Sequence, residues 1–388
     1  MTKKSLPLFR NLLLCALIGW LGVYASLLST LSNRLAAQFS LVDTAAGRFI
    51  TAHALGMLLS VLLSGSLADS IGKRRIVLVS CALMVAGLIV TFLAQSLTAI
   101  LIGLFLTGMG FSPSEAISSA LLTDENPEHA TKWMNWSQVC FGLGAVLSPL
   151  ALVWYLSVGQ PYGGLLLICA GLVFVSGLLI LLAGGDMGAG KADKTRLNMF
   201  SVLKSRTVLI CCLMVFFYLG CESVGLAYLK QLFPEEAATL ADLSVSLLWL
   251  GMIVLRLVGT RMDGKELVSL RYLTLLIPLG AVISLLAPGP ELRLLGAVLY
   301  GAGCGAVWPM LFVLAGRSLP QRSGAVFAVM MIFTTAGNAV FPYFIGEIVG
   351  NAATTIILCA ALALLLPALS FPLERSFGSP RSLAAQQG

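Results

Sequence analysis

Charged side chains are scarce in this sequence, and their scarcity decides its class. Of the 388 residues, only 11% are Asp, Glu, Lys or Arg, whereas a soluble domain carries about 25%. Hydrophobic residues make up 58% of the chain, and its mean hydropathy is +0.96. A soluble protein of two or three domains, which the length alone would favour, is therefore excluded. We expect an integral membrane protein whose length is set by helices of about 20 apolar residues each.

Histidine and paired cysteines are also lacking, which argues against enzymes and metal sites. The two histidines, His53 and His129, lie far apart in the sequence. The nine cysteines all fall inside apolar runs and none forms a CxxC pair, so we interpret them as packing residues. No nucleophile–base set is indicated. We therefore expect neither an enzyme nor a bound metal or cofactor.

The net charge of +7 does not indicate a nucleic-acid partner. Nucleic-acid-binding proteins gather basic residues in one patch, whereas here they recur in short clusters between apolar runs. Such clusters are typical of the cytoplasmic ends of membrane helices. Their distribution predicts that both termini are cytoplasmic, and we expect the inner membrane of a bacterium.

Twelve apolar stretches are long enough to cross a membrane as helices. A polar, basic segment at 185–206 stands at the midpoint and separates six spans from six. We predict an all-α membrane protein of two pseudo-symmetric six-helix halves, 1–184 and 207–388, joined by a cytoplasmic linker at 185–206. The expected spans lie near 11–33, 47–67, 74–95, 98–122, 133–156, 163–184, 207–229, 243–260, 271–287, 292–316, 323–346 and 351–370.

A short motif occurs at the same place in both halves. Span two ends in GSLADSIGKRR (65–75), and span eight ends in RLVGTRMDGK (256–265). Each places an aspartate four residues after a glycine, followed by basic residues in a tight turn, which favours the internal repeat of many secondary transporters. We expect Arg256 to pair with Asp69 or Asp263. The residues expected to gate the cytoplasmic side are Asp69, Lys73, Arg74, Arg256 and Asp263.

The repeated motif resembles the signature loop between spans two and three of the major facilitator superfamily. The twelve spans and the central loop resemble that family as well. The resemblance implies alternating access, with substrate bound near the midplane between the halves. Two positions depart from the family pattern: Ser70 replaces a usual Arg, and Leu104 replaces an Arg common in span four of its exporters. The second departure weighs against a drug/proton antiporter.

A narrower resemblance is to the fucose permease-like group of sugar–proton symporters. Glu115 matches the span-four glutamate of that group, and the stretch 135–149 resembles its span five. Similar likenesses cover its spans eight, ten and eleven, at 249–257, 301–309 and 337–342. The group also has an Asp in span one, but residues 24–31 of this chain contain no acid. The resemblance implies proton-coupled uptake of a monosaccharide.

Acidic residues inside apolar spans are the candidate proton-coupling sites. An ionised acid at a helix centre costs roughly 2.5 to 3.5 kcal/mol, so it is a functional-site hypothesis by default. Glu115 and Glu222 fit this description, and protonation would remove their charge and so gate helix motion. His53 is a candidate proton relay. The structural alternatives are packing for Glu115, contact with Lys230 or solvent near the external mouth for Glu222, and an interior hydrogen bond for His53.

Polar and aromatic residues in the spans are the candidate substrate contacts. Amide side chains can bind sugar hydroxyls or link helices, and aromatic rings can stack on a sugar or pack in the core. One amide, Asn338, comes from the resemblance in span eleven. The candidate substrate-binding residues are Tyr24, Asn135, Trp136, Gln138, Trp308 and Asn338.

These observations favour a monomeric transporter whose partners are protons, a small solute and the lipid bilayer. The leading hypothesis is proton-coupled uptake of a monosaccharide or similar small polar solute. A proton-driven exporter of a small metabolite or drug remains open, because the spans contain few polar residues. A membrane sensor that transports nothing is less favoured, since the sequence offers no soluble output domain.

Overall fold

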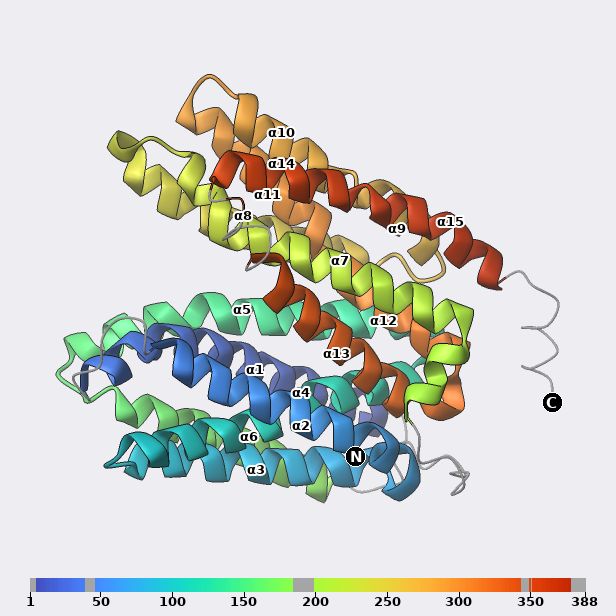
Figure 1. Cartoon of the computed structure of the whole chain (residues 1–388). Coiled ribbons are helices and arrows are strands. Elements are labelled where there is room, and N and C mark those ends of the chain that lie inside the picture. Colours follow the sequence, from blue (N-terminus) through green and yellow to red (C-terminus); the bar gives the residue numbers. More distant parts are fainter. Residues whose placement is uncertain (1–4, 39–45, 184–198, 343–348, 350, 378–388) are drawn as a thin grey trace. The chain divides into compact units, whose positions relative to one another are not determined.

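Helices form every regular element in the part of the chain that the computed structural model describes, residues 5–38, 46–183, 199–342, 349 and 351–377 (Figure 1). Most of the expected linker, residues 185–198, lies outside these ranges. The α-helices are α1 (Ser5–Gln38), α2 (Ala46–Ile71), α3 (Lys73–Leu93), α4 (Leu97–Glu125), α5 (Ala130–Ser157), α6 (Gly163–Leu182), α7 (Arg206–Tyr228), α8 (Ala238–Gly259), α9 (Glu266–Leu273), α10 (Leu276–Leu286), α11 (Pro290–Gly305), α12 (Val307–Ser318), α13 (Ser323–Phe341), α14 (Ala352–Ala363) and α15 (Leu365–Phe377).

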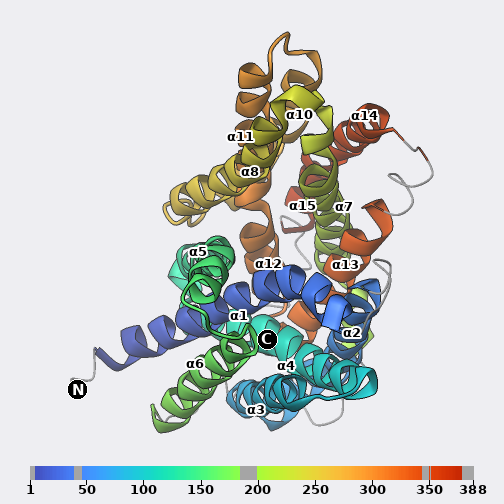
Figure 2. The same cartoon turned by 90° about the vertical axis from the view of Figure 1, so that its left-hand side faces the viewer.

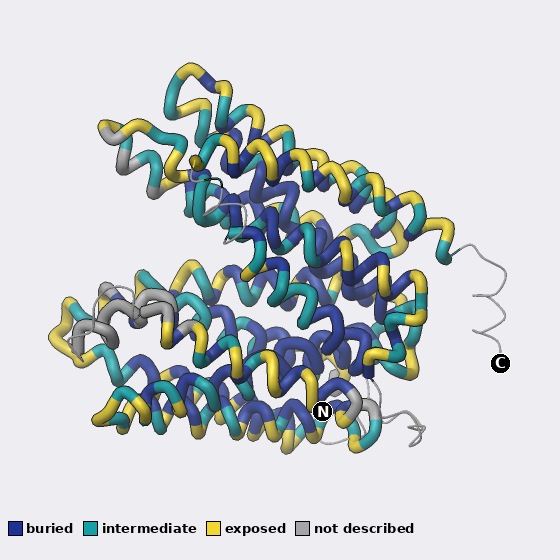
Figure 3. The backbone as a smooth tube through the Cα atoms, in the orientation of Figure 1, coloured by how far each residue is buried: buried dark blue, intermediate teal, exposed yellow. Residues whose placement is uncertain are grey.

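The predicted twelve-span fold is confirmed. Ten helical segments of the described chain are long and apolar enough to cross a membrane, and two shorter apolar helices, Thr51–Gly65 and Leu243–Gly259, supply the second and eighth spans. Three spans consist of two helices each, namely α9–α10, α11–α12 and α14–α15. Exposed residues follow the outer edges of α3 and α15, as Figure 3 shows. Apolar side chains on such faces are suited to lipid.

Each two-helix span breaks three residues before a proline. The break residues are Leu275, Ala306 and Leu364, and the prolines are Pro278, Pro309 and Pro367. A proline has no amide hydrogen and its ring clashes with the carbonyl four residues earlier, so the preceding helix ends there. The same residue is well tolerated in the first turn of a new helix. The breaks therefore follow from the sequence.

The described helices fall into two compact units. Unit 1 comprises Met1–Pro127, Trp136–Met199 and Gln321–Val329, and unit 2 comprises Glu128–Asn135, Phe200–Pro320 and Met330–Gly388. In unit 1, α4 packs against α1, α2 and α3, and α6 packs against α3 (Figure 2). In unit 2, α11 packs against α8 and α10, and α7 packs against α12, α14 and α15. Unit 1 thus includes the start of α13, and unit 2 includes the start of α5.

The most deeply buried helices of the two units are equivalent. In α4, every residue from Gly110 to Thr123 is buried, and in α11–α12 every residue from Tyr300 to Gly316 is buried. An offset of 193 residues relates the two segments, as from Thr123 to Gly316. The same offset takes Pro113 to the break at Ala306, and Glu115 to Trp308. Two residues singled out for their chemistry thus occupy equivalent positions.

Glycines set the contacts of these buried helices in the same register. Gly103, Gly108 and Gly110 of α4 correspond to Gly296, Gly301 and Gly303 of α11 at identical spacing. A Cβ atom on Gly108 would lie 2.0 Å from the carbonyl oxygen of His53 in α2. A Cβ atom on Gly301 would lie 2.0 Å from the carbonyl oxygen of Leu248 in α8. Small residues let membrane helices approach this closely, so the repeat is a repeat of contacts as well as of spans.

We predict that Gly108→Ala and Gly301→Ala each lower the midpoint of thermal unfolding in detergent. The added methyl group meets backbone, which cannot yield as a flexible side chain does, and overpacking costs roughly 1–3 kcal/mol. The matched control is Gly171→Ala in α6, where a Cβ atom meets nothing within 4 Å. The control should melt at or slightly above the wild-type temperature, because Ala favours helix over Gly. Equal melting of Gly108→Ala and Gly171→Ala would contradict this packing account.

Candidate functional site

Glu115 lies in the most polar part of the buried stretch of α4. Glu115 is 8% exposed. Four serines close to it in the sequence are all buried: Ser112, Ser114, Ser118 and Ser119. The hydroxyl of Ser114 is 2.8 Å from that of Ser80 in α3. The structure therefore buries Glu115 in a stretch of α4 that is rich in buried hydroxyl residues.

A buried hydrogen-bonded cluster lies nearer the start of α4 than Glu115 does. The hydroxyl of Thr107 donates to the carbonyl of Leu104, at 2.7 Å, so it accepts the proton of the Tyr24 hydroxyl, also at 2.7 Å. The Nδ1 atom of His53 is 3.4 Å from both hydroxyl oxygens. The ring of Phe111 packs against the rings of Tyr24 and His53, with centroid distances of 6.1 and 5.5 Å. Helices α1, α2 and α4 thus bring two predicted residues, Tyr24 and His53, into one cluster.

Thr107, Phe111 and Glu115 are spaced four residues apart, so they follow one another along one face of α4. The sequence interpretation singled out Glu115 and missed the other two. Their spacing from Glu115 was the available signal. Because of this spacing, the predicted proton acceptor shares a helix face with a hydrogen-bonded Tyr–His–Thr group.

Unit 2 contains a second charged cluster, built on α7 and α8. The hydroxyl of Tyr218 donates to the carboxylate of Glu222, one turn later in α7. The guanidinium of Arg256 in α8 interacts electrostatically with both side chains. Arg256 also donates from Nε to the carbonyl oxygen of Gly305, at 3.0 Å. Of the two partners expected for Arg256, Asp263 instead accepts hydrogen bonds from the first amides of α5. The side chain of Asp69, the other expected partner, lies outside the described residues, so that pairing stays a prediction. For Glu222, whose structural alternative was a pair with Lys230 or solvent, the structure shows the hydrogen bond from Tyr218.

The contact between Arg256 and Gly305 has a local cause. Pro309 lacks an amide hydrogen, so it cannot make the helical hydrogen bond to the carbonyl of Gly305 four residues earlier. A buried carbonyl needs a donor, and the guanidinium supplies one. Arg256 is 4% exposed, and its Nε lies at the break between α11 and α12.

The other predicted substrate residues have mixed surroundings. Trp308 is 5% exposed and stacks on Phe312, with a centroid distance of 4.0 Å. Asn338 of α13 is exposed and accepts a hydrogen bond from Ser223 of α7. Trp136 of α5 is 40% exposed.

The two amides at the start of α5 are buried. Asn135 donates to the carbonyl of Thr131, at 2.8 Å, and a Cβ atom on Gly259 would lie 2.5 Å from its side-chain oxygen. Asn135 therefore packs against α8 within unit 2. Gln138, one turn later, is 4% exposed.

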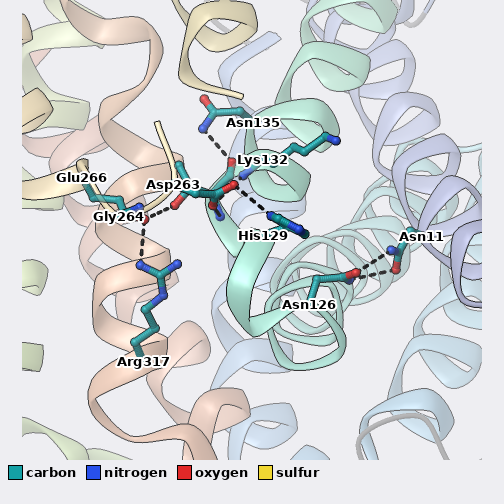
Figure 4. Close-up of polar contacts among 10 residues, drawn as sticks. Asn11, Asn126, His129, Lys132, Asn135, Asp263, Gly264, Glu266 and Arg317 are labelled. Atoms are coloured by element: carbon teal, nitrogen blue, oxygen red, sulfur yellow. Dashed lines mark hydrogen bonds and ion pairs between the residues drawn. The ribbon is translucent and has the colours of Figure 1, made fainter. Parts of the chain in front are cut away.

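Each unit contains an ion pair between helix ends, and the two pairs occupy equivalent positions in the repeat. In unit 1, Lys73 at the start of α3 pairs with Asp124 near the end of α4, at 3.0 Å, and Ser323 at the start of α13 donates to Asp124, at 2.9 Å. In unit 2, Arg317 of α12 pairs with Glu266 of α9, at 2.7 Å, and Thr131 of α5 donates to the same carboxylate (Figure 4). Sequence reasoning had identified only Lys73 among these residues.

The two ion pairs have opposite polarity. The 193-residue offset takes Lys73 to Glu266 and Asp124 to Arg317. Helix dipoles favour acids at helix starts and bases at helix ends. The dipoles therefore favour the pair of unit 2 and disfavour the pair of unit 1. The repeat conserves the position of the interaction and reverses its charges.

Two of the remaining predicted gating residues, Asp263 and Arg74, bind helix ends. Asp263 accepts hydrogen bonds from the backbone amides of Thr131 and Lys132, at 2.9 and 3.3 Å, and His129 lies 3.7 Å from it (Figure 4). Arg74 donates to the carbonyls of Ile180 and Leu181 at the end of α6. The side chain of Asp69 lies outside the described part of the chain.

Comparison with known proteins gives a family match over most of the chain. The family model described as the Major Facilitator Superfamily matches residues 12–342. The chain is 29% identical over 192 residues to the uncharacterized MFS-type transporter YwfA of Bacillus subtilis (strain 168). It is 30% identical over 139 residues to the 4-hydroxybenzoate transporter PcaK of Pseudomonas putida. These alignments cover 49% and 35% of this chain but only 45% and 31% of the relatives, less than half their length.

A solved structure is similar over nearly the whole chain. The fucose:proton symporter FucP of E. coli superposes with a TM-score of 0.78, at 19% sequence identity, over 95% of this chain and 99% of that one. At this identity the likeness shows the fold.

We predict that Asp263→Ala lowers the stability of the protein by about 1 kcal/mol, because the first amides of α5 lose their acceptor. The measurement is the thermal unfolding midpoint in detergent. The matched control is Glu374→Ala, since Glu374 is also paired, with Arg271 at 2.6 Å, but its side chain is 54% exposed. Exposed pairs contribute little, so the control should melt close to wild type. Equal losses in the two variants would show that Asp263 does not cap α5.

Proposed function

Because the chain belongs to the Major Facilitator Superfamily and is a transporter rather than an enzyme, we propose that it couples uptake of a small polar solute to a proton. The favoured solute class is a monosaccharide or a similar hydroxylated molecule. The transporter FucP, whose fold the chain shares, is named a fucose:proton symporter. The relative PcaK is named a 4-hydroxybenzoate transporter, so both names point to small solutes with hydroxyl groups.

The observation that carries this proposal is the burial of Glu115 on the same face of α4 as Thr107 and Phe111. A carboxylate inside a membrane protein is costly while it is charged. Taking up a proton removes that cost, so protonation can favour one conformation of unit 1 over another. Tyr24 and His53, hydrogen-bonded or close to Thr107, are the neighbouring groups proposed to bind solute and relay the proton.

The driving force is sufficient for useful accumulation. Moving one charge across 100 mV supplies about 2.3 kcal/mol. At about 1.4 kcal/mol per tenfold change in concentration, one proton per neutral solute supports roughly fifty-fold accumulation. The proposal needs no nucleotide or other cofactor.

The polar helix ends are the proposed gate. The pairs Lys73–Asp124 and Glu266–Arg317, together with Asp263 at the start of α5, hold the ends of α13 and α5 in place. We place them on the cytoplasmic side, with residues 1–184 and 207–388 as the two halves, because the basic clusters follow the positive-inside rule. Opening this side during transport requires the hydrogen bonds from Ser323 to Asp124 and from Thr131 to Glu266 and Asp263 to break, because these join residues of different halves. The protein is proposed to act as a monomer in a bacterial inner membrane.

We predict that Glu115→Gln abolishes solute uptake driven by a pH gradient and leaves the protein folded. Glutamine keeps the shape of protonated Glu115 but cannot exchange a proton. The measurement is uptake of labelled solutes by proteoliposomes with an acidic exterior, using a panel of sugars and a panel of lipophilic cations. Uptake of sugars supports import, whereas expulsion of the cations would support the exporter alternative.

The matched control for that experiment is Glu128→Gln, because Glu128 is exposed and lies between α4 and α5. It should transport like wild type. Undiminished gradient-driven uptake by Glu115→Gln would remove Glu115 from the coupling mechanism. Thermal unfolding of both variants shows whether a loss of uptake is due to misfolding.

A further inference from the structure

The hydroxyl groups beside His53 form a chain of hydrogen bonds with a fixed direction. Each hydroxyl has a single hydrogen to donate. Thr107 donates its hydrogen to the carbonyl oxygen of Leu104, at 2.7 Å. The hydrogen of Tyr24 therefore points to the oxygen of Thr107, also 2.7 Å away. The chain runs from Tyr24 through Thr107 to Leu104, where it ends on a backbone carbonyl.

This direction decides which ring nitrogen of His53 carries hydrogen. The Nδ1 atom lies 3.4 Å from the oxygens of Tyr24 and Thr107. Both hydroxyl groups direct their hydrogens to other acceptors, so each offers Nδ1 only a lone pair. The ring of His53 also donates to the backbone of Leu104, the residue on which the chain ends. These surroundings favour a hydrogen on Nδ1, shared between acceptors, and they leave the basic lone pair on Nε2.

The equivalent positions of unit 2 show that packing alone does not need these side chains. His53 corresponds to Leu248, because the carbonyl oxygen of each meets the equivalent glycine of α4 or α11. The 193-residue offset takes Thr107 to Tyr300. Leu248 is apolar and buried, and Tyr300 donates directly to the carbonyl of Cys221 in α7, at 2.6 Å. Unit 2 thus joins the same kind of helices without an imidazole, so the imidazole of unit 1 has a role beyond packing.

We infer that Thr107 is a positioning residue, which holds neutral His53 with its hydrogen on Nδ1 so that the relayed proton binds Nε2. The inference rests on the proposed function, in which His53 relays the proton. A proton from water binds the lone pair of Nε2, and the ring becomes an imidazolium. Loss of the same proton restores the starting tautomer, so Tyr24 and Thr107 keep their hydrogens throughout. The hydroxyl chain is no part of the proton path, because its last member is a carbonyl that cannot pass a proton on.

Neutral groups surround this imidazole. Helix α1 contributes Tyr24, and α4 contributes Thr107 and Phe111, whose ring packs edge-on against that of His53 with centroids 5.5 Å apart. Cys169 of α6 interacts with Tyr24. Within the part of the chain that the structure describes, no charged side chain pairs with the ring of His53. A proton on Nε2 therefore creates a buried charge, which favours a conformation that brings the ring closer to water.

Nitrogen NMR measures the tautomer directly. The chain contains two histidines, His53 and His129, so isotope-labelled histidine marks only two rings of the full chain in lipid. The variant His129→Gln identifies the signals of His53. Ring nitrogens with and without hydrogen have different chemical shifts, and only Nε2 is bonded to Cδ2. At alkaline pH, we expect the hydrogen of neutral His53 on Nδ1. On acidification, the signal of Nε2 should change to that of a protonated nitrogen.

The variant Thr107→Val tests the positioning role, because valine keeps the shape and lacks the hydroxyl. The hydrogen of Tyr24 then loses its acceptor, and Nδ1 of His53, 3.4 Å away, can take its place. We expect the hydrogen of neutral His53 to move to Nε2. Uptake driven by a pH gradient should fall by at least about tenfold, since Nε2 is then no longer basic. Thr107→Ser keeps the hydroxyl, so it should keep both the wild-type tautomer and the uptake.

The matched control is Thr91→Val in α3. Thr91 is also buried and also donates to a carbonyl one turn earlier, that of Gly87, at 2.8 Å. It takes no part in the hydrogen bonds of His53. We expect this variant to show the tautomer and the uptake of wild type.

Three results would overturn the inference: neutral wild-type His53 carries its hydrogen on Nε2, Thr107→Val leaves the tautomer unchanged, or Thr107→Val loses no more uptake than Thr91→Val. Each is compatible with proton-coupled uptake by wild type, so the proposed function would stand. Absence of gradient-driven uptake of every solute by wild type would reject the proposed function, and with it the relay through Nε2. Where Thr107→Val does not fold, the tautomer of wild type and its response to acid decide the matter.

Discussion

The cost of charge inside an apolar bundle is the constraint on which the rest of this structure depends. Only 11% of the residues are charged, and several of those that lie inside helices have a visible counterpart. Lys73 pairs with Asp124, and Glu266 pairs with Arg317. Because leaving one member of such a pair alone is strongly unfavourable, each pair ties two helices together. A transporter can use this property, since a proton or a solute that neutralises one member releases the other.

Close packing between helices provides the rigid frame around these charges. Glycines of α4 and α11 allow neighbouring backbones to approach at the same register in both units. Within this frame the two units differ at the equivalent positions that matter chemically. Glu115 corresponds to Trp308, and the pair Lys73–Asp124 corresponds to Glu266–Arg317 with reversed charge. The duplicated scaffold therefore keeps its contacts, while the chemistry of the two units has diverged.

Much of the fold could be predicted from the sequence, because apolar runs of about 20 residues and basic turns are local signals. The sequence analysis missed that three of the spans consist of two helices each, although the proline three residues after each break indicated it. Burial of Glu115 was expected correctly. The hydrogen bond from Arg256 to the carbonyl of Gly305 was not expected, since it depends on which faces of α8 and α11 meet, and no pattern within one helix reveals this. The pair Glu266–Arg317 was missed for the same reason. Because its charges are reversed, the sequence does not show it as a repeat of Lys73–Asp124.

Proton movement caused by the solute tests the central claim most directly. Proteoliposomes with a trapped pH-sensitive dye are prepared with equal pH on both sides and no membrane potential. A solute that binds the protein is then added outside. The account predicts that the interior becomes acidic as the solute enters, at a rate that follows the amount of protein in the membrane. Entry of labelled solute without any change in internal pH would contradict it, because the carboxylates of this bundle would then carry no protons during transport.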